Sequence, residues 1–157
     1  MICFDTTILI WGVQGQAKSG QEEMVGRTRR FIESLHEQNE QIMVPTPALA
    51  EYLQGFETDD RKKQLAILER SFITPAFDLP AAYLAAGLAR KAAALPKGET
   101  PKQTVKTDLQ IIATAIHHGA TKIITNEKAH FEKLADGRIA ISEVPNLHKQ
   151  EKLSYDA

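Results

Sequence analysis

Short apolar segments alternate along the chain with longer segments of helical periodicity, and this alternation limits the possible folds more than any other feature. The longer segments carry apolar side chains at every third or fourth position, as helices with one buried face do. Helices of this length between short strands are typical of crossover connections, which join parallel strands. We therefore predict an α/β fold with a mostly parallel central sheet and helices on both of its faces. The expected strands cover residues 1–4, 42–44, 72–74, 122–125 and 139–141.

Capping residues indicate where the helices begin and end. Gly119 stands at an expected C′ position and Thr107 at an expected N-cap, so Asp108 falls in a first turn. Pro47 suits the first turn of its helix, and Asp59 or Asp60 can cap the next one. The expected helices cover residues 22–38 and 80–95, with others after Thr6, Pro47, Asp60, Thr107 and Glu127, and exposed loops are expected at 12–20 and 96–104.

The whole chain is expected to form one domain, residues 1–145, followed by a polar tail, residues 146–157. Its net charge of −1 argues against a globally basic nucleic-acid binder but allows a local basic groove. The single cysteine, Cys3, cannot form an internal disulfide and is expected to pack in the core. No apolar run approaches the roughly 20 residues of a membrane span, and Asp5 precedes any basic signal region. A cytoplasmic protein without a membrane partner is expected.

Four acidic residues are expected near one edge of the sheet. Asp5 and Glu127 each follow the end of a predicted strand, and such sheets bind ligands beyond the carboxyl ends of their strands. At 100° per residue, Asp108 falls within the arc of Ile112 and its apolar neighbours, so its carboxylate points toward the core. That placement is costly unless a cation or hydrogen-bond donors receive the charge. Glu51 lies in a helix that borders the same edge.

The periodicity around Glu51 argues against placing this residue at the acidic edge. Leu49, Leu53 and Phe56 define an apolar stripe, and Glu51 lies on the side opposite to it.

Carboxylates gathered at one edge repel one another and raise one another's pKa unless cations are present. Ligands that are all oxygen suit Mg²⁺ or Mn²⁺, and the sequence has no Cys/His cluster with zinc spacing. Metal-assisted hydrolysis of a phosphodiester bond is the chemistry that follows from such a site.

Four short motifs resemble those of the PIN-domain nucleases. They are FDTT at the start of the chain, PALAE in the middle, KTDLQIIATAIHHG and IITNEKAHF. They occur in the family's order over residues 1 to about 144, and they are most similar to the bacterial VapC-type toxins of toxin–antitoxin pairs. The resemblance implies a three-layer α/β/α sandwich and Mg²⁺- or Mn²⁺-dependent cleavage of RNA. It also implies a homodimer and inhibition by a cognate antitoxin.

By position in these motifs, Asp5, Glu51 and Asp108 are the implied acids that bind the metal and carry catalysis, with Glu127 as the fourth. The family most often has Asp where this chain has Glu127, so the longer side chain is expected to move or weaken a second metal site. The supporting polar residues, which accompany Asp5 and the fourth acid, are Thr6 and Asn126.

A locally basic run precedes Asp108 and is the candidate contact for an RNA backbone. Its candidate RNA-binding residues are Lys97, Lys102 and Lys106, and a solvated loop is the alternative interpretation. His117 and His118 at a helix end are interpreted as partners of the helix dipole or a solvated pair rather than a metal site.

Other interpretations of the acids remain open. A covalent phosphatase of the haloacid dehalogenase type would attack with Asp5 but needs a second Asp where this chain has Thr7. A receiver-like switch needs a phosphoacceptor Asp in the segment 72–74, which has none. The last alternative is a degenerate PIN-like module that binds RNA or protein without nuclease activity. The reason to consider it is Glu127, which stands where the family most often has Asp.

Overall fold

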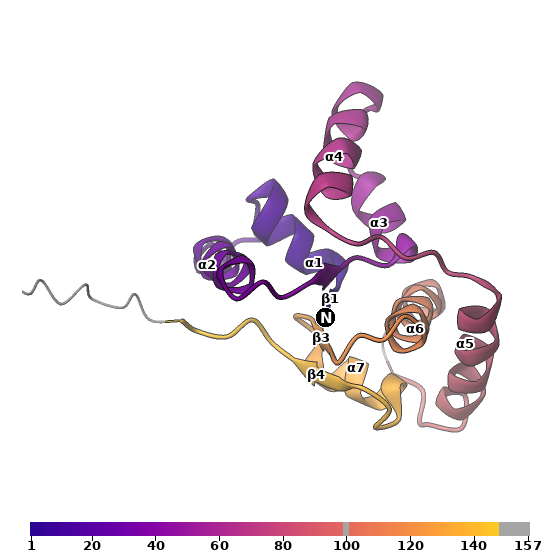
Figure 1. Cartoon of the computed structure of the whole chain (residues 1–157). Helices are drawn as coiled ribbons and strands as arrows, with labels where there is room; N and C mark the ends of the chain where they lie inside the picture. Colours follow the sequence, from indigo (N-terminus) through magenta and orange to yellow (C-terminus); the bar gives the residue numbers. More distant parts are fainter. Residues whose placement is uncertain (99–100, 148–157) are drawn as a thin grey trace, which may run out of the picture.

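A four-stranded parallel sheet forms the centre of the computed structural model, which describes residues 1–98 and 101–147 (Figure 1). Its strand order is β2-β1-β3-β4, and every neighbouring pair is parallel. This confirms the predicted α/β fold. Residues 148–157 of the expected tail lie outside the described residues. The strands are β1 (Ile2–Phe4), β2 (Ile42–Met43), β3 (Lys122–Ile124) and β4 (Ala140–Ser142).

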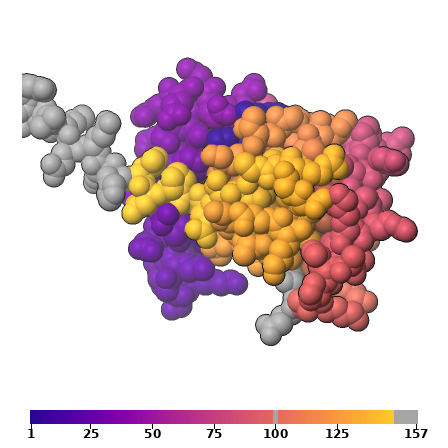
Figure 2. Space-filling view, turned by 90° about the horizontal axis from the view of Figure 1, so that it is seen from below, coloured from indigo at the N-terminus to yellow at the C-terminus, as the bar shows by residue number. Residues whose placement is uncertain are grey.

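Helices cover both faces of this sheet and give the molecule three layers. Helix α2 lies on one face and α6 on the other, with α5 packed on the outer side of α6 (Figure 1). Helices α3 and α4 form an arm that projects from the body, and in Figure 2 α7 and β4 fill the middle of the face. The helical elements are α1 (Thr6–Leu9), the π-helical segment η1 (Ile10–Gln14), α2 (Glu23–Glu37), α3 (Thr46–Leu53), α4 (Thr58–Ser71), α5 (Leu79–Ala92), α6 (Lys102–His117) and α7 (Lys128–Ala135).

The core lies between the sheet and these helices. Phe4 of β1 packs against Phe31 of α2 and Phe72, with ring centroids 6.3 and 6.1 Å away. Ile112 and Phe131 are fully buried on the other face. No helix in residues 1–98 or 101–147 is long and apolar enough to cross a membrane.

The strand predicted at 72–74 does not form, and a single bridge between Met43 and Ile73 replaces it. Ile73 N donates to Ile42 O, and Val44 N donates to Ile73 O. The next bond of a parallel ladder would need an N–H from Pro75, which has none. Pro75 therefore interrupts the ladder, although its carbonyl still accepts from Thr46 N over 3.0 Å.

Helix α6 begins at Lys102, five residues before the predicted N-cap Thr107. The Thr107 hydroxyl donates to Gln103 O one turn earlier, so it is a mid-helix back-bond rather than a cap. Asp108 therefore lies in the second turn, not the first, and the predicted loop at 96–104 is shorter than expected. The predicted end is confirmed, since Gly119 follows the helix with φ +84°.

Three other boundaries differ from the sequence prediction. The N-cap of α4 is Glu57, so Asp59 and Asp60 lie in the first turn rather than capping it. Helix α5 ends at Ala92 instead of Leu95, and the helical start at Thr6 runs on to Gln14 before Gly15 turns the chain with φ +73°.

Cys3 is fully buried in the core, as predicted. Two large aromatic side chains, Trp11 and Tyr52, are also in the core, exposed by 2 and 3%. Tyr52 also packs against Phe56 with ring centroids 5.1 Å apart, and its hydroxyl donates to Gln64. Burial leaves neither Trp11 nor Tyr52 free to stack on a base.

Candidate active site

The sheet reverses its winding between β1 and β3, and a crevice is expected beyond the strands at such a point. From β1 the chain crosses to β2 on one side, whereas β3 and then β4 lie on the other. The two strand ends are adjacent, because Asp5 N donates to Ile124 O over 3.1 Å. Residues that follow β1 and β3 therefore meet at this edge.

Asp5 is held rigidly at the end of β1. It caps α1 by accepting from Thr6 N over 2.7 Å, and it accepts from Thr125 Oγ1 over 2.8 Å. Only 5% of the residue is exposed. Burial, together with the nearby charges of Asp108 and Glu51, raises the pKa of Asp5 from 3.8 to about 7, while the two hydrogen bonds oppose the shift.

Asp108 faces the same edge from α6. It is 4% exposed, as its inward angle on the helix predicted, and its Oδ2 lies 2.9 Å from Nε2 of His130 on α7. Burial, and then repulsion from Glu127 and Glu51, raise the pKa of Asp108 from 3.8 to about 7.

Glu51 and Glu127 complete the group from more exposed positions. Burial of part of its side chain, and then the charge of Glu127, raise the pKa of Glu51, while the Thr6 hydroxyl lowers it. Thr6 Oγ1 is buried and influences Glu51, but it makes no hydrogen bond of ordinary geometry. Glu127 precedes α7, and its N–H donates to Thr125 Oγ1 over 3.1 Å. The four predicted acids thus lie close enough for the charge of one to raise the pKa of another.

Glu51 is exposed, as its position opposite the apolar stripe predicted. The fully buried positions of α3 are Ala48 and Tyr52, whereas Leu49 and Leu53 are only partly buried. Glu51 is three residues after Ala48 and next to Tyr52, so it borders the buried side. From this exposed position its charge still raises the pKa values of Asp5 and Asp108.

These acids suit a cation that keeps some of its water. Within the described residues, no three of the four bring ligand oxygens within 4.8 Å of one another. Mg²⁺ usually retains several waters and is bound directly by one or two carboxylates. An all-oxygen donor set whose members raise one another's pKa fits Mg²⁺ or Mn²⁺ on charge and chemistry.

Two residues of the site were not predicted from the sequence. Thr125 is fully buried and links Asp5 to the backbone of Glu127, whereas the predicted Asn126 beside it is exposed. The strand-end rule that selected Asp5 applies equally to Thr125. His130 gives no comparable signal, because only the packing of α7 on α6 brings it to Asp108.

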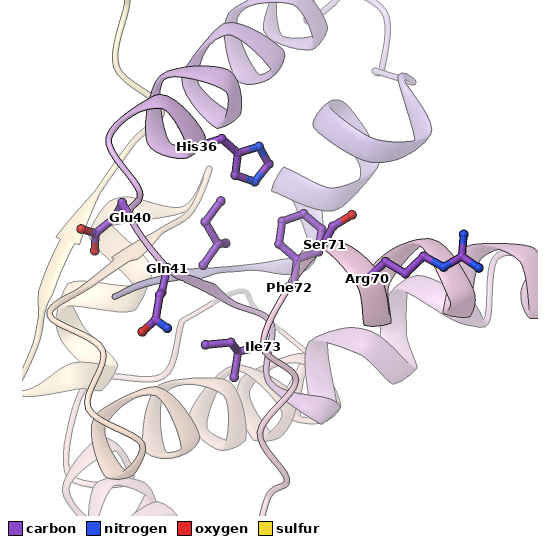
Figure 3. Close-up of a pocket in the computed structure, with 8 residues that line it drawn as sticks. His36, Glu40, Gln41, Arg70, Ser71, Phe72 and Ile73 are labelled. Carbon is purple, nitrogen blue, oxygen red and sulfur yellow. The ribbon is translucent and has the colours of Figure 1, made fainter.

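A shallow hollow of about 620 Å³ adjoins the acids and is lined by Asn126, Glu127, His130 and neighbouring residues of α7. A second hollow, of about 250 Å³, lies near the start of β2 between His36, Arg70 and Phe72 (Figure 3). None of the predicted site residues lines the second hollow.

The three candidate lysines lie before or on the first turns of α6. Lys97 precedes the helix, and Lys102 and Lys106 lie one turn apart on it; all three are exposed. Lys106 is two residues from Asp108, about 200° around the helix, so the lysines of α6 lie on its exposed side and Asp108 on its buried side.

Solved structures of similar fold support this architecture. VapBC2 from Rickettsia felis, bound to a DNA fragment from its promoter, has a TM-score of 0.65 and 19% identity, over 91% of this chain and 98% of that chain. DNA-bound VapBC from Salmonella typhimurium has a TM-score of 0.64 and 18% identity, over 92% and 98%. VapBC-1 from nontypeable Haemophilus influenzae has a TM-score of 0.63 and 17% identity, over 91% and 98%.

Comparison with curated protein sequences gave no match. The comparison with protein families gave a match to the PIN domain over residues 2–137. That match contains both ends of the acidic edge, from Asp5 to Glu127. With the parallel sheet and its winding reversal, it shows that the chain belongs to the PIN domain family.

Proposed function

We propose that this protein is an Mg²⁺- or Mn²⁺-dependent endoribonuclease and the toxin of a toxin–antitoxin pair. One observation carries the proposal: Asp5, Glu51, Asp108 and Glu127 come from four separate parts of the chain and converge where the sheet reverses its winding. Burial, and then the repulsion of neighbouring acids, raise the pKa values of Asp5 and Asp108, which supports a cation as the partner of these carboxylates.

In this proposal Asp5 and Asp108 bind the cation directly or through water, and Glu51 and Glu127 support it from the rim. A bound Mg²⁺ or Mn²⁺ would activate water and offset charge on the scissile phosphate. Thr125 and Thr6 N fix both carboxylate oxygens of Asp5, so its orientation does not depend on the substrate. His130 holds one oxygen of Asp108 in the same way.

The RNA is proposed to enter across α6 and the hollow beside Glu127. Lys97, Lys102 and Lys106 offer positive charge for the phosphate backbone on the approach to Asp108. Thr6 and Asn126 are proposed as supporting polar groups, Thr6 toward Glu51 and Asn126 in the wall of the hollow.

The proposed partners are a cognate antitoxin, which would block this edge, and a second copy of the chain. Support comes from the likeness in fold to three VapBC structures. We propose that the pair acts in the cytoplasm, where its RNA substrate is found.

The direct test is cleavage of a mixed RNA pool by the purified protein with Mg²⁺, with Mn²⁺ and with EDTA. Wild-type protein should cut with either metal and not with EDTA, and Asp5→Asn and Asp108→Asn should abolish cutting. Asp59→Asn is the matched control, because Asp59 is an exposed acid in the first turn of α4. Full metal-dependent cleavage by Asp108→Asn would contradict the assignment.

The same assay separates the nuclease from the degenerate module. No cleavage, no change of thermal stability with Mn²⁺ and RNA binding that persists in EDTA would support the binding module instead.

The contribution of the lysines is tested by the salt dependence of RNA binding to an uncleaving Asp5→Asn protein. Changing Lys97, Lys102 and Lys106 to Ala should reduce the slope of log affinity against log salt by about 0.7 per lost phosphate contact. An unchanged slope would remove this segment from the RNA footprint.

A further inference from the structure

A second cluster of ligating side chains lies at the end of α6 remote from the acids. Asp78 precedes α5, His117 is the last residue of α6 and His118 is its C-cap. One ligand atom of each lies within 4.8 Å of the other two. His117 is nine residues after Asp108, a rise of about 13 Å along the helix, so this cluster is separate from the acidic edge.

Both histidines approach the same carboxylate oxygen. Nε2 of His118 lies 3.2 Å from Oδ2 of Asp78, and Nε2 of His117 lies 3.7 Å from it. Two ligands of a tetrahedral ion with bonds of 2.0–2.1 Å are about 3.3 Å apart. The two measured separations bracket that value, so small side-chain movements would suffice to place one ion between the three atoms.

The surrounding structure orients these ligands. Oδ1 of Asp78 accepts from Ala81 N over 3.1 Å as the cap of α5, which leaves Oδ2 directed at the histidines. The imidazole rings meet edge to face with centroids 4.8 Å apart. The carbonyl oxygen of Ala76 lies 3.1 Å from the same Nε2 of His118, which would exchange this contact for the ion on binding.

We propose that Asp78, His117 and His118 form a binding site for Zn²⁺ or a similar first-row transition-metal ion. Two imidazoles and one carboxylate suit Zn²⁺, whereas Mg²⁺ prefers ligands that are all oxygen. The ion would tie the start of α5 to the end of α6, and the partial exposure of all three residues leaves a fourth position open to water. This site does not depend on the nuclease proposal, and it replaces the interpretation of the histidines as a solvated pair.

The test is titration of the untagged full-length protein with Zn²⁺, followed by calorimetry and by the metal content after dialysis. In the Asp5→Asn, Asp108→Asn background, which removes two carboxylates that could compete for the ion, one equivalent of Zn²⁺ should bind. His117→Ala and His118→Ala should each weaken binding by at least about tenfold, since even outer partners of metal ligands are worth 10- to 100-fold. His36→Ala is the control, because His36 lies on α2 and should leave binding unchanged.

Asp78 needs a variant that preserves the fold. Asp78→Ser keeps an N-cap for α5 but removes the carboxylate, so it should lose Zn²⁺ affinity while its helix content stays that of the wild type. A hundredfold excess of Mg²⁺ should not displace the bound Zn²⁺. Absence of Zn²⁺ binding in the wild type, or wild-type affinity in His117→Ala and His118→Ala, would overturn the proposal and leave the histidines as charge partners of Asp78.

Discussion

Replacing Asp108 with Asn removes a charge from the acidic site with little change of shape. Burial and the repulsion of Glu127 and Glu51 raise the pKa of Asp108 from 3.8 to about 7. At 1.36 kcal/mol per pKa unit, that rise corresponds to about 4 kcal/mol of stability lost when the carboxyl ionises. The amide of Asn can still pair with Nε2 of His130. We therefore expect Asp108→Asn to be more stable than the metal-free wild type at alkaline pH.

The sign of the pH dependence follows from proton binding. The native state keeps the Asp108 proton up to about pH 7, whereas the unfolded chain releases it near 3.8, so the native state binds more protons between these values. Stability of the wild type therefore falls as pH rises through this window, and the variant lacks that part of the fall. The gain from the substitution should be about 1 kcal/mol at pH 4.5 and should approach about 4 kcal/mol at pH 8.

Urea unfolding in EDTA at pH 4.5 and pH 8 measures this difference. Asp59→Asn is the control, because its exposed carboxylate should change stability by no more than about 0.5 kcal/mol at either pH. Mg²⁺ added at pH 8 should narrow the gap, since a cation bound to the native wild type stabilises it. An equal gain at both pH values, or a loss of stability at pH 8, would refute the reasoning.

Two further predictions concern single contacts. Thr125→Val removes the hydroxyl that donates to buried Asp5 and accepts from Glu127 N, so it should lower the free energy of unfolding by about 1–3 kcal/mol at pH 8. Thr125→Ser keeps the hydroxyl and should lose less. A Val variant as stable as the wild type would contradict this. Gly119→Ala should lower the free energy of unfolding by about 1 kcal/mol, because φ at this position is +84°. Gly87 lies inside α5 with open space around it, so Gly87→Ala should raise the free energy of unfolding by about 0.5–1 kcal/mol. Thermal unfolding that gave both changes the same sign would contradict this prediction.

Local patterns predicted most of the fold. The alternation of short strands and helices gave the parallel sheet, and Gly119 marked the end of α6 correctly. Where local patterns failed, another local rule usually explains the error. The strand at 72–74 was lost to the missing N–H of Pro75, and Thr107 bonded back to Gln103 instead of capping a helix.

The site was only partly predictable. The strand-end rule brought Asp5 and Glu127 to one edge, and helical periodicity turned Asp108 inward, because both depend on the chain's own geometry. Periodicity also placed Glu51 on the exposed side of α3, but its proximity to the other acids depends on how α3 packs against α1 and α6.

The sequence by itself thus determined most of the elements and the shared edge of Asp5, Asp108 and Glu127. Only the tertiary structure decided that Thr125 holds Asp5, that His130 meets Asp108, and that Asp78 joins His117 and His118. Periodicity reports which face of an element is buried, because the repeat of the backbone fixes it. The partner on that face depends on how separate elements pack together, and no local repeat encodes this.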